Sequence, residues 1–205
     1  MSFDALKSNF DHESPGTQSR VRAFGLYLLE VIRVVIVALA IIIPVRYFLI
    51  QPFYVKGASM EPNFEDHEYL IIDELSYRFR EPLRGDIVVF RYPYDPSQFF
   101  IKRVIGLPGE RVDIRDGAIR IRTAEHPNGF TLVEDYLAPN VTTPGERSVT
   151  LGMDEFFVLG DNRRASFDSK DFGPIPRRAI VGRAWFRGWP PSKFSRFTAP
   201  AYAIP

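Results

Sequence analysis

The sequence predicts a mostly β protein: an antiparallel β core with a small loop-rich insertion, preceded by one N-terminal transmembrane helix. Three observations indicate this fold class. Beyond residue 51, short apolar runs are separated by Gly, Pro and Asp, as is typical of strands. One of these segments alternates apolar and polar residues around an Asp-Gly pair, which is a strong hairpin signal. Near the N-terminus, a long apolar stretch has almost no charge, as a membrane-spanning helix requires.

The N-terminal part divides by polarity. Residues 1–23 are polar and predict a tail, whose acidic residues argue against an organellar transit peptide. Residues 24–52 predict the membrane anchor. Val34 to Val45 carry no charge, and extension to Phe53 adds only Arg46, which gives the roughly 20 residues that a span needs. The alternatives are a buried helix of a soluble protein and a cleaved signal peptide, although the apolar run starts late for the second.

The remaining chain predicts a β core interrupted by an insertion. Residues 53–122 and 151–192 form the expected core, and residues 123–150, richer in Pro, Thr, Asn and Gly, form the expected insertion or small subdomain. Residues 193–205 form a C-terminal tail. A hairpin is expected around Asp116-Gly117. Further strands are expected at Tyr69–Ile72, Asp86–Tyr92, Phe100–Ile105, Glu155–Leu159 and Ile180–Phe186.

Composition excludes several classes of function. A formal net charge of +1 gives no reason to expect nucleic acid as a partner. The chain has no cysteine, so disulfides, thiolate nucleophiles and the usual structural zinc sites are excluded. Its three histidines are scattered without the spacing of metal ligands. No metal and no cofactor are therefore expected.

A serine and a lysine carry the candidate chemistry. Ser59 lies in a Gly-Ala-Ser-Met-Glu-Pro segment, and Lys102 lies beside Arg103 in a predicted strand. A serine hydroxyl needs a base to attack a carbonyl, and lysine can serve if its pKa falls from about 10.4 to near 7–8, roughly 4 kcal/mol of desolvation. Arginine does not deprotonate in proteins. Strand alternation alone does not choose between the two basic residues, and an ordinary solvated lysine is the alternative interpretation of Lys102.

Four segments resemble, in order, the motifs of type I signal peptidases: Gln51–Pro62, Gly85–Phe90, Lys102–Glu110 and Gly160–Ser169. The resemblance covers roughly residues 48–176. It implies a membrane-anchored serine endopeptidase with a Ser–Lys dyad, which removes signal peptides from exported preproteins. It also implies a mostly β catalytic core with a second domain, which is small here because only about fifty residues separate the third segment from the fourth.

The resemblance implies a role for each matching position. Ser59 matches the nucleophile, and Lys102 matches the general base, which takes the hydroxyl proton and returns it to the leaving amine. Ser166 matches a serine whose hydroxyl orients the lysine. The other supporting positions are Asp161 and Asp168, expected to pair with Arg103 and Lys170, and Gly57.

Three positions depart from the usual motif. Gly57 stands where many relatives have a serine that donates to the oxyanion, so the oxyanion hole is expected to rely on backbone N–H groups, including that of Ser59. The segment Arg163-Arg164-Ala165 replaces the more typical Arg-Asp-Asn. Lys170 stands where arginine is usual, so its contact with Asp168 is expected to become a single-point contact.

Cleavage after small residues such as alanine is also implied by the resemblance. An extended substrate is expected to pair with the strand edge near Phe53–Ala58 and to place alternate side chains in shallow pockets. The candidate substrate-binding residues are Ala58, Met60 and Ile87. The aromatic residues of the C-terminal segment either rest on the bilayer surface or pack in the core; they are Trp185, Phe186, Trp189, Phe194 and Phe197.

The expected partners are signal peptides of secreted preproteins, membrane lipid and nearby export machinery, with no nucleic acid. The expected location is the bacterial cytoplasmic (inner) membrane, single-pass, with the catalytic domain on the extracytoplasmic side. Basic residues before the span favour this orientation, and those after it count against it. One alternative is a specialised relative that matures one substrate, of conjugative pilin or organellar inner-membrane type. Another is a non-catalytic membrane protein that binds signal sequences. A self-cleaving repressor would carry a DNA-reading helical domain in place of the apolar span.

Overall fold

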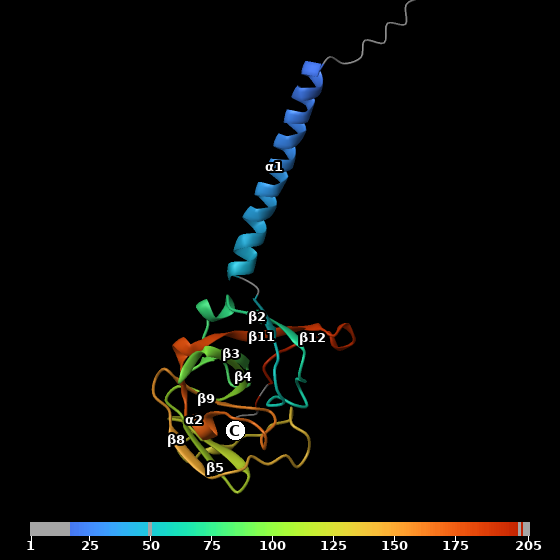
Figure 1. Ribbon diagram of the computed structural model, residues 1–205. Coiled ribbons are helices and arrows are strands. Elements are labelled where there is room, and N and C mark those ends of the chain that lie inside the picture. Colours follow the sequence, from blue (N-terminus) through green and yellow to red (C-terminus); the bar gives the residue numbers. More distant parts are fainter. Residues whose placement is uncertain (1–16, 49–50, 201, 203–205) are drawn as a thin grey trace, which may run out of the picture. The chain divides into compact units, whose positions relative to one another are not determined.

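The computed structural model describes residues 17–48, 51–200 and 202 (Figure 1). Contacts divide the chain into two compact units, residues 1–45 and 46–205, each described by itself. Helix α1 (Thr17–Phe48) makes up the described part of the first unit. Its 21-residue stretch Phe24–Pro44 is long and apolar enough to cross a membrane, and none of it is buried in the protein. Glu30 and Arg33 are the charged residues within this stretch, and its other side chains are almost all apolar, as a lipid-facing span requires.

The ends of the helix differ from the expected anchor. Residues 17–23, expected as part of a polar tail, are helical. Residues Gln51–Tyr54, at the end of the expected span, form strand β1, because their backbone pairs with Tyr69–Ile72. Residues 1–16 of the expected tail lie outside the described part of the chain.

The second unit contains a large antiparallel sheet in the order β1-β2-β11-β3-β4-β9-β10, with β12 paired to β11. The five strands expected from the apolar runs are all present, as β2, β3, β4, β9 and β11. Short helical turns connect these strands. The bounds are β1 (Gln51–Tyr54), β2 (Tyr69–Asp73), η1 (Ser76–Arg78), β3 (Ile87–Tyr92), β4 (Asp95–Gly106), β9 (Glu155–Leu159), α2 (Ser169–Phe172), β10 (Ile175–Pro176), η2 (Arg177–Ala179), β11 (Ile180–Trp189), η3 (Pro191–Lys193) and β12 (Ser195–Arg196).

A smaller sheet has the order β7-β6-β5-β8, with bounds β5 (Arg111–Arg115), β6 (Ala118–Arg122), β7 (Phe130–Thr131) and β8 (Arg147–Thr150). The hairpin predicted around Asp116-Gly117 is confirmed: φ is 52° at Asp116 and 79° at Gly117, as a two-residue turn of type I′ requires. Strands β7 and β8 lie in the segment expected as an insertion, and they pair with the hairpin. The division into core and insertion stays a prediction.

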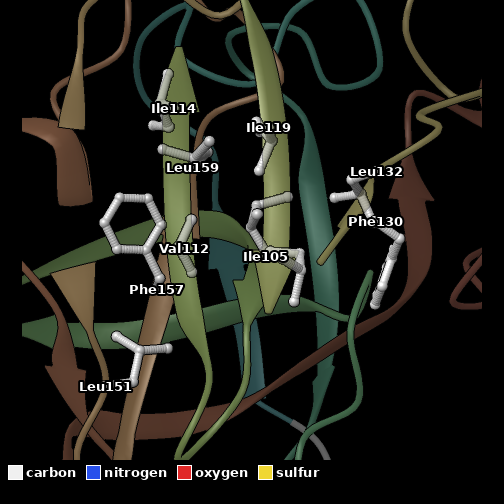
Figure 2. Close-up of a cluster of buried hydrophobic side chains, with 10 residues drawn as sticks. Ile105, Val112, Ile114, Ile119, Phe130, Leu132, Leu151, Phe157 and Leu159 are labelled. Carbon is white, nitrogen blue, oxygen red and sulfur yellow. The ribbon is translucent and has the colours of Figure 1, made fainter. Parts of the chain in front are cut away.

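One hydrophobic cluster joins the two sheets. Figure 2 shows apolar side chains of β5 and β6, such as Val112 and Ile119, gathered with Phe157 and Leu159 of β9. Each of these side chains is at most 1% exposed. The outward positions of the hairpin are polar or small, so its period-two pattern places one face in the core.

Two further clusters lie on opposite faces of the β3–β4 pair. Val88 and Phe90 belong to one cluster, and Ile87 and Val89 belong to the other. The register pairs Val88 with Lys102 and Ile87 with Arg103. The side chains of the two neighbouring basic residues therefore leave β4 on opposite faces of the sheet.

The first half of β4 has an unpaired edge. Residues 95–103 of β4 pair with β3, but β9 pairs with β4 only over Arg103–Gly106. The chain leaves the sheet after Leu159, the partner of Arg103. Among the described strands, none pairs with the second edge of β4 before Arg103, and Lys102 therefore lies where this edge becomes open.

Candidate active site

The candidate nucleophile lies on a loop that β1 and β2 hold at both ends. The Val55 N–H donates to the Glu68 carbonyl at 2.8 Å, and the His67 N–H donates to the Val55 carbonyl at 3.1 Å. Gly57 has φ of +93°, a backbone conformation that favours glycine, and its N–H donates to Asp66 Oδ1 at 2.9 Å. The loop then brings Ser59 to Lys102, although the two residues are 43 positions apart in the chain.

Lys102 is buried beside that serine. Its Nζ lies 2.8 Å from Ser59 Oγ and 2.9 Å from the Ile101 carbonyl oxygen, and the side chain is near the Phe100 ring. The residue is only 4% exposed. Burial disfavours the charged ammonium and lowers the pKa of Lys102 from 10.5 to about 8, which outweighs the opposing influence of Asp168. The amine can therefore lose its proton near neutral pH.

Arg103 and Asp161 form a buried ion pair on the other face of β4. The Arg103 guanidinium donates to both oxygens of Asp161, at 2.8 and 2.6 Å, and to the Gly85 carbonyl at 3.0 Å. It also stacks on the Tyr136 ring, 3.8 Å from the centroid. Asn63 Nδ2 donates to Asp161 Oδ2 at 2.8 Å, which connects the pair to the chain just after the nucleophile. The pairing of Arg103 with Asp161 expected from the resemblance is thus present. Arg103 is bound in this ion pair, whereas Lys102 contacts the hydroxyl of Ser59.

Asp168 and Lys170 also pair as expected, but not through a single point. Lys170 Nζ lies 2.7 Å from each oxygen of Asp168. The expectation of a single-point contact is wrong, because the three donors of an ammonium let it sit between two carboxylate oxygens. Asp168 also accepts from the Gly160 N–H at 3.0 Å and caps helix α2 through the Lys170 N–H. This carboxylate therefore fixes the turn between β9 and α2.

Ser166 does not make the expected contact with the lysine. Its hydroxyl is buried and has no hydrogen-bond partner among the described residues. The hydrogen bonds of Lys102 Nζ go to Ser59 and to the Ile101 carbonyl instead. Ser166 nevertheless lies close to the site, since a Cβ added at Gly160 would collide with the Ser166 hydroxyl and with the Ser59 carbonyl oxygen. Its orienting role stays a prediction.

A small groove runs from the serine between β1 and the open edge of β4. Its volume is about 110 Å³, and most of the lining residues are apolar. They come from the two strands that flank the groove and from the strands behind it. The apolar lining includes Phe53, Val55, Leu70, Val89, Phe99 and Ile101, and Ser59 and Lys102 also line the groove.

None of the three residues expected to bind substrate lines this groove. Met60 is fully buried and packs in the cluster that contains Phe64, because the loop turns its side chain inward. Ile87 is buried opposite Arg103, two positions before Val89, which does line the groove. Ala58 is exposed, and its carbonyl is held by a side chain from another loop. Val89 and Ile101 were not predicted, although period-two alternation from Ile87 along β3 and from Arg103 along β4 could have indicated them.

The C-terminal aromatic residues divide between core and surface. The Phe197 ring contacts the Phe64 ring in a tilted arrangement, with 4.5 Å between ring centroids, so Phe197 packs against the core. Trp189 and Phe194 are more than half exposed, at 54% and 57%. Trp185 and Phe186 are partly buried. Contact of the exposed pair with a bilayer stays a prediction.

Most of this chain is similar in sequence to known proteins. Residues 28–189 match the family described as "Signal peptidase, peptidase S26". The chain is 38% identical over 180 residues to "Probable signal peptidase I-2" of Synechocystis sp., covering 84% of this chain and 78% of the relative. It is 30% identical over 178 residues to "Signal peptidase IB" of Staphylococcus aureus, covering 82% of this chain and 92% of the relative. A crystal structure of a signal peptidase I from Enterococcus faecalis is similar, with 33% identity and a TM-score of 0.42, over 51% of this chain and 97% of that one. On the family match and these relatives, the chain belongs to the signal peptidase family, peptidase S26.

Proposed function

We propose that this chain is a membrane-bound serine endopeptidase that removes N-terminal signal peptides from exported preproteins, with Ser59 as nucleophile and Lys102 as general base. One observation carries the assignment of residues. The Lys102 amine lies 2.8 Å from the Ser59 hydroxyl and is almost completely buried. A lysine in water stays protonated at neutral pH, whereas a buried one with pKa of about 8 supplies a neutral amine.

The mechanism follows from this contact. Neutral Lys102 accepts the Ser59 proton while Oγ attacks the carbonyl carbon of the scissile peptide, which gives a tetrahedral oxyanion. The Ser59 N–H is the expected donor to that oxyanion, because it has no acceptor among the described residues. The Lys102 ammonium then protonates the leaving amine, and an acyl-enzyme remains. A water molecule, deprotonated by Lys102, hydrolyses the ester and restores Ser59.

The groove supports an extended substrate with small side chains near the cleaved bond. Two open strand edges, one on β1 and one on β4, flank the groove, and each offers main-chain hydrogen bonds to a peptide. The groove has a volume of about 110 Å³ and mostly apolar walls beside Ser59, which favours apolar side chains next to the cleaved bond. Recognition of the backbone combined with small pockets suits many different preproteins.

The membrane placement rests on the apolar stretch Phe24–Pro44. We place the protein in the bacterial cytoplasmic membrane as a single-pass protein, with the second unit on the extracytoplasmic side, where exported preproteins emerge. Membrane lipid is then a partner, and export machinery is a neighbour. Basic residues ahead of the stretch support this orientation.

The test is cleavage of a purified preprotein by the full-length protein in detergent, with the new N-terminus determined by sequencing. Ser59→Ala and Lys102→Ala are each expected to abolish cleavage, and Lys102→Arg is expected to be inactive because arginine keeps its proton. Ser192→Ala, at an exposed serine near β12, is the matched control and should cleave normally. Normal processing by either alanine variant of the pair contradicts the proposed roles.

A further inference from the structure

The backbone on both sides of Ser59 is held by one residue of another loop. Asn162 Nδ2 donates to the Ala58 carbonyl at 3.0 Å, and the Asn162 N–H donates to the Ser59 carbonyl at 3.1 Å. The two carbonyls flank the nucleophile in the chain. The side-chain oxygen of Asn162 accepts from the Ala165 N–H at 3.2 Å, and this hydrogen bond orients the side-chain amide so that Nδ2 faces the loop that carries Ser59.

We propose that Asn162 is a positioning residue for the oxyanion hole, acting through the peptide group that joins Ala58 to Ser59. This inference rests on the proposed function. The Ala58 carbonyl and the Ser59 N–H belong to the same planar trans peptide, in which C=O and N–H point in opposite directions. A hydrogen bond that holds the carbonyl toward Asn162 therefore aims the N–H away from Asn162, toward the side on which the oxyanion forms.

The neighbouring contacts leave this N–H available. The Gly57 N–H is bound to Asp66, whereas the Ser59 N–H has no acceptor in the described part of the chain. A hydrogen bond accepted by the carbonyl polarises the amide and makes its N–H a better donor. Gly57 supplies no hydroxyl, so the aim of the Ser59 N–H matters more here than in a relative with serine at that position.

The base and this peptide are connected through one short segment. Asp161, the residue before Asn162, is bound to Arg103, and Arg103 follows Lys102 in β4. The strand that carries the general base thus fixes, through the ion pair, the residue that aims the oxyanion donor. This connection holds the Lys102 amine, which accepts the proton, and the Ser59 N–H, which donates to the oxyanion, in fixed positions relative to each other.

Asn162→Asp and Asn162→Ala test the proposal in the full-length protein. The aspartate keeps the acceptor for the Ala165 N–H and loses the donor to the Ala58 carbonyl. It therefore tests the loss of the donor even if the alanine variant fails to fold. Loss of one oxyanion donor costs about 100- to 1,000-fold in kcat, so misalignment of the donor is expected to lower kcat by roughly 10- to 100-fold, with KM changed by less than about threefold. Asn128→Asp, an exposed asparagine in the turn before β7, is the control and should match the native enzyme.

Inhibitor binding separates positioning from general damage. A peptide aldehyde forms a tetrahedral adduct with the serine and uses the oxyanion hole, whereas the cleaved product peptide does not. The variants should bind the aldehyde more weakly by about the factor lost in kcat and bind the product as the native enzyme does. Asn162→Ala, which adds no charge near Lys102, should also keep the same midpoint in the pH–rate profile. Equal weakening of both ligands, or native kcat in both variants, overturns the inference. Failure of the native protein to cleave the preprotein overturns the proposed function instead.

Discussion

The rate of cleavage should depend on pH through the protonation of Lys102. Burial lowers the pKa of this amine from 10.5 to about 8, a change that corresponds to about 3 kcal/mol. At pH 7 about a tenth of the amine is then neutral, compared with roughly one part in 3,000 for an unperturbed lysine. The environment of Lys102 therefore increases the active base about 300-fold at pH 7.

The measurement is kcat/KM for a quenched fluorescent peptide that contains a preprotein cleavage site, between pH 6 and 10 in detergent. The plot of log(kcat/KM) should rise with a slope near one up to about pH 8 and then level off, because only the neutral amine accepts the Ser59 proton. A profile that is flat over this range, or a midpoint near 10.5, would refute the assignment of a buried neutral base.

The same group makes stability depend on pH with a defined sign. Its folded pKa is below its unfolded pKa, so the unfolded chain binds more protons between about pH 8 and 10.5, and the free energy of unfolding rises with pH there. This stability is lost as pH falls through about 8. Relative to Lys102→Met, which has no such group, the native protein should lose about 2.5 kcal/mol between pH 10 and 7. Chemical denaturation at both pH values measures this, and a difference independent of pH contradicts it.

Three other substitutions have defined outcomes. Asp161→Ala leaves the Arg103 guanidinium buried without its carboxylate, so the free energy of unfolding should fall by about 3–5 kcal/mol. Urea denaturation measures this change, and an unchanged midpoint would contradict a stabilising ion pair. Gly160→Ala should abolish cleavage with little change in circular dichroism, because its Cβ collides with the Ser59 carbonyl; a fully active variant would show that the turn relaxes. Ile101→Phe fills the groove and should raise KM for the peptide by about tenfold or more, and native steady-state kinetics would place the substrate elsewhere.

Much of the second unit could be predicted from its sequence. The hairpin at Asp116-Gly117 and five strands of the large sheet follow from local patterns, which depend on nearby residues alone; these strands are β2, β3, β4, β9 and β11. The short strands β7, β8, β10 and β12 were not predicted. The approach of Lys102 to Ser59 was inferred from chemistry and resemblance, since no local pattern relates residues 43 positions apart. The predicted span extended too far toward the C-terminus, since residues Gln51–Tyr54 form strand β1. An apolar residue such as Phe53 suits a strand and a membrane span equally, so hydropathy did not distinguish the two.

The less predictable parts depend on tertiary contacts. Tyr136 stacks on Arg103 from a loop that has no periodic pattern, so nothing in its surroundings predicted a place beside the site. Met60 was expected near substrate because it follows the nucleophile, but the loop turns it into the core. The contact of Asn162 with Ala58 depends on where two irregular loops meet, which sequence spacing does not define.

The open edge of β4 has a consequence for errors in processing. A precursor that forms main-chain hydrogen bonds with this edge can shift its register along β4. A shift by one residue turns the small side chains near the cleavage site away from the groove and points the adjacent side chains into it. Only shifts by an even number of residues keep the same side chains inward. Mature proteins with ragged N-termini should therefore differ in length by two residues more often than by one.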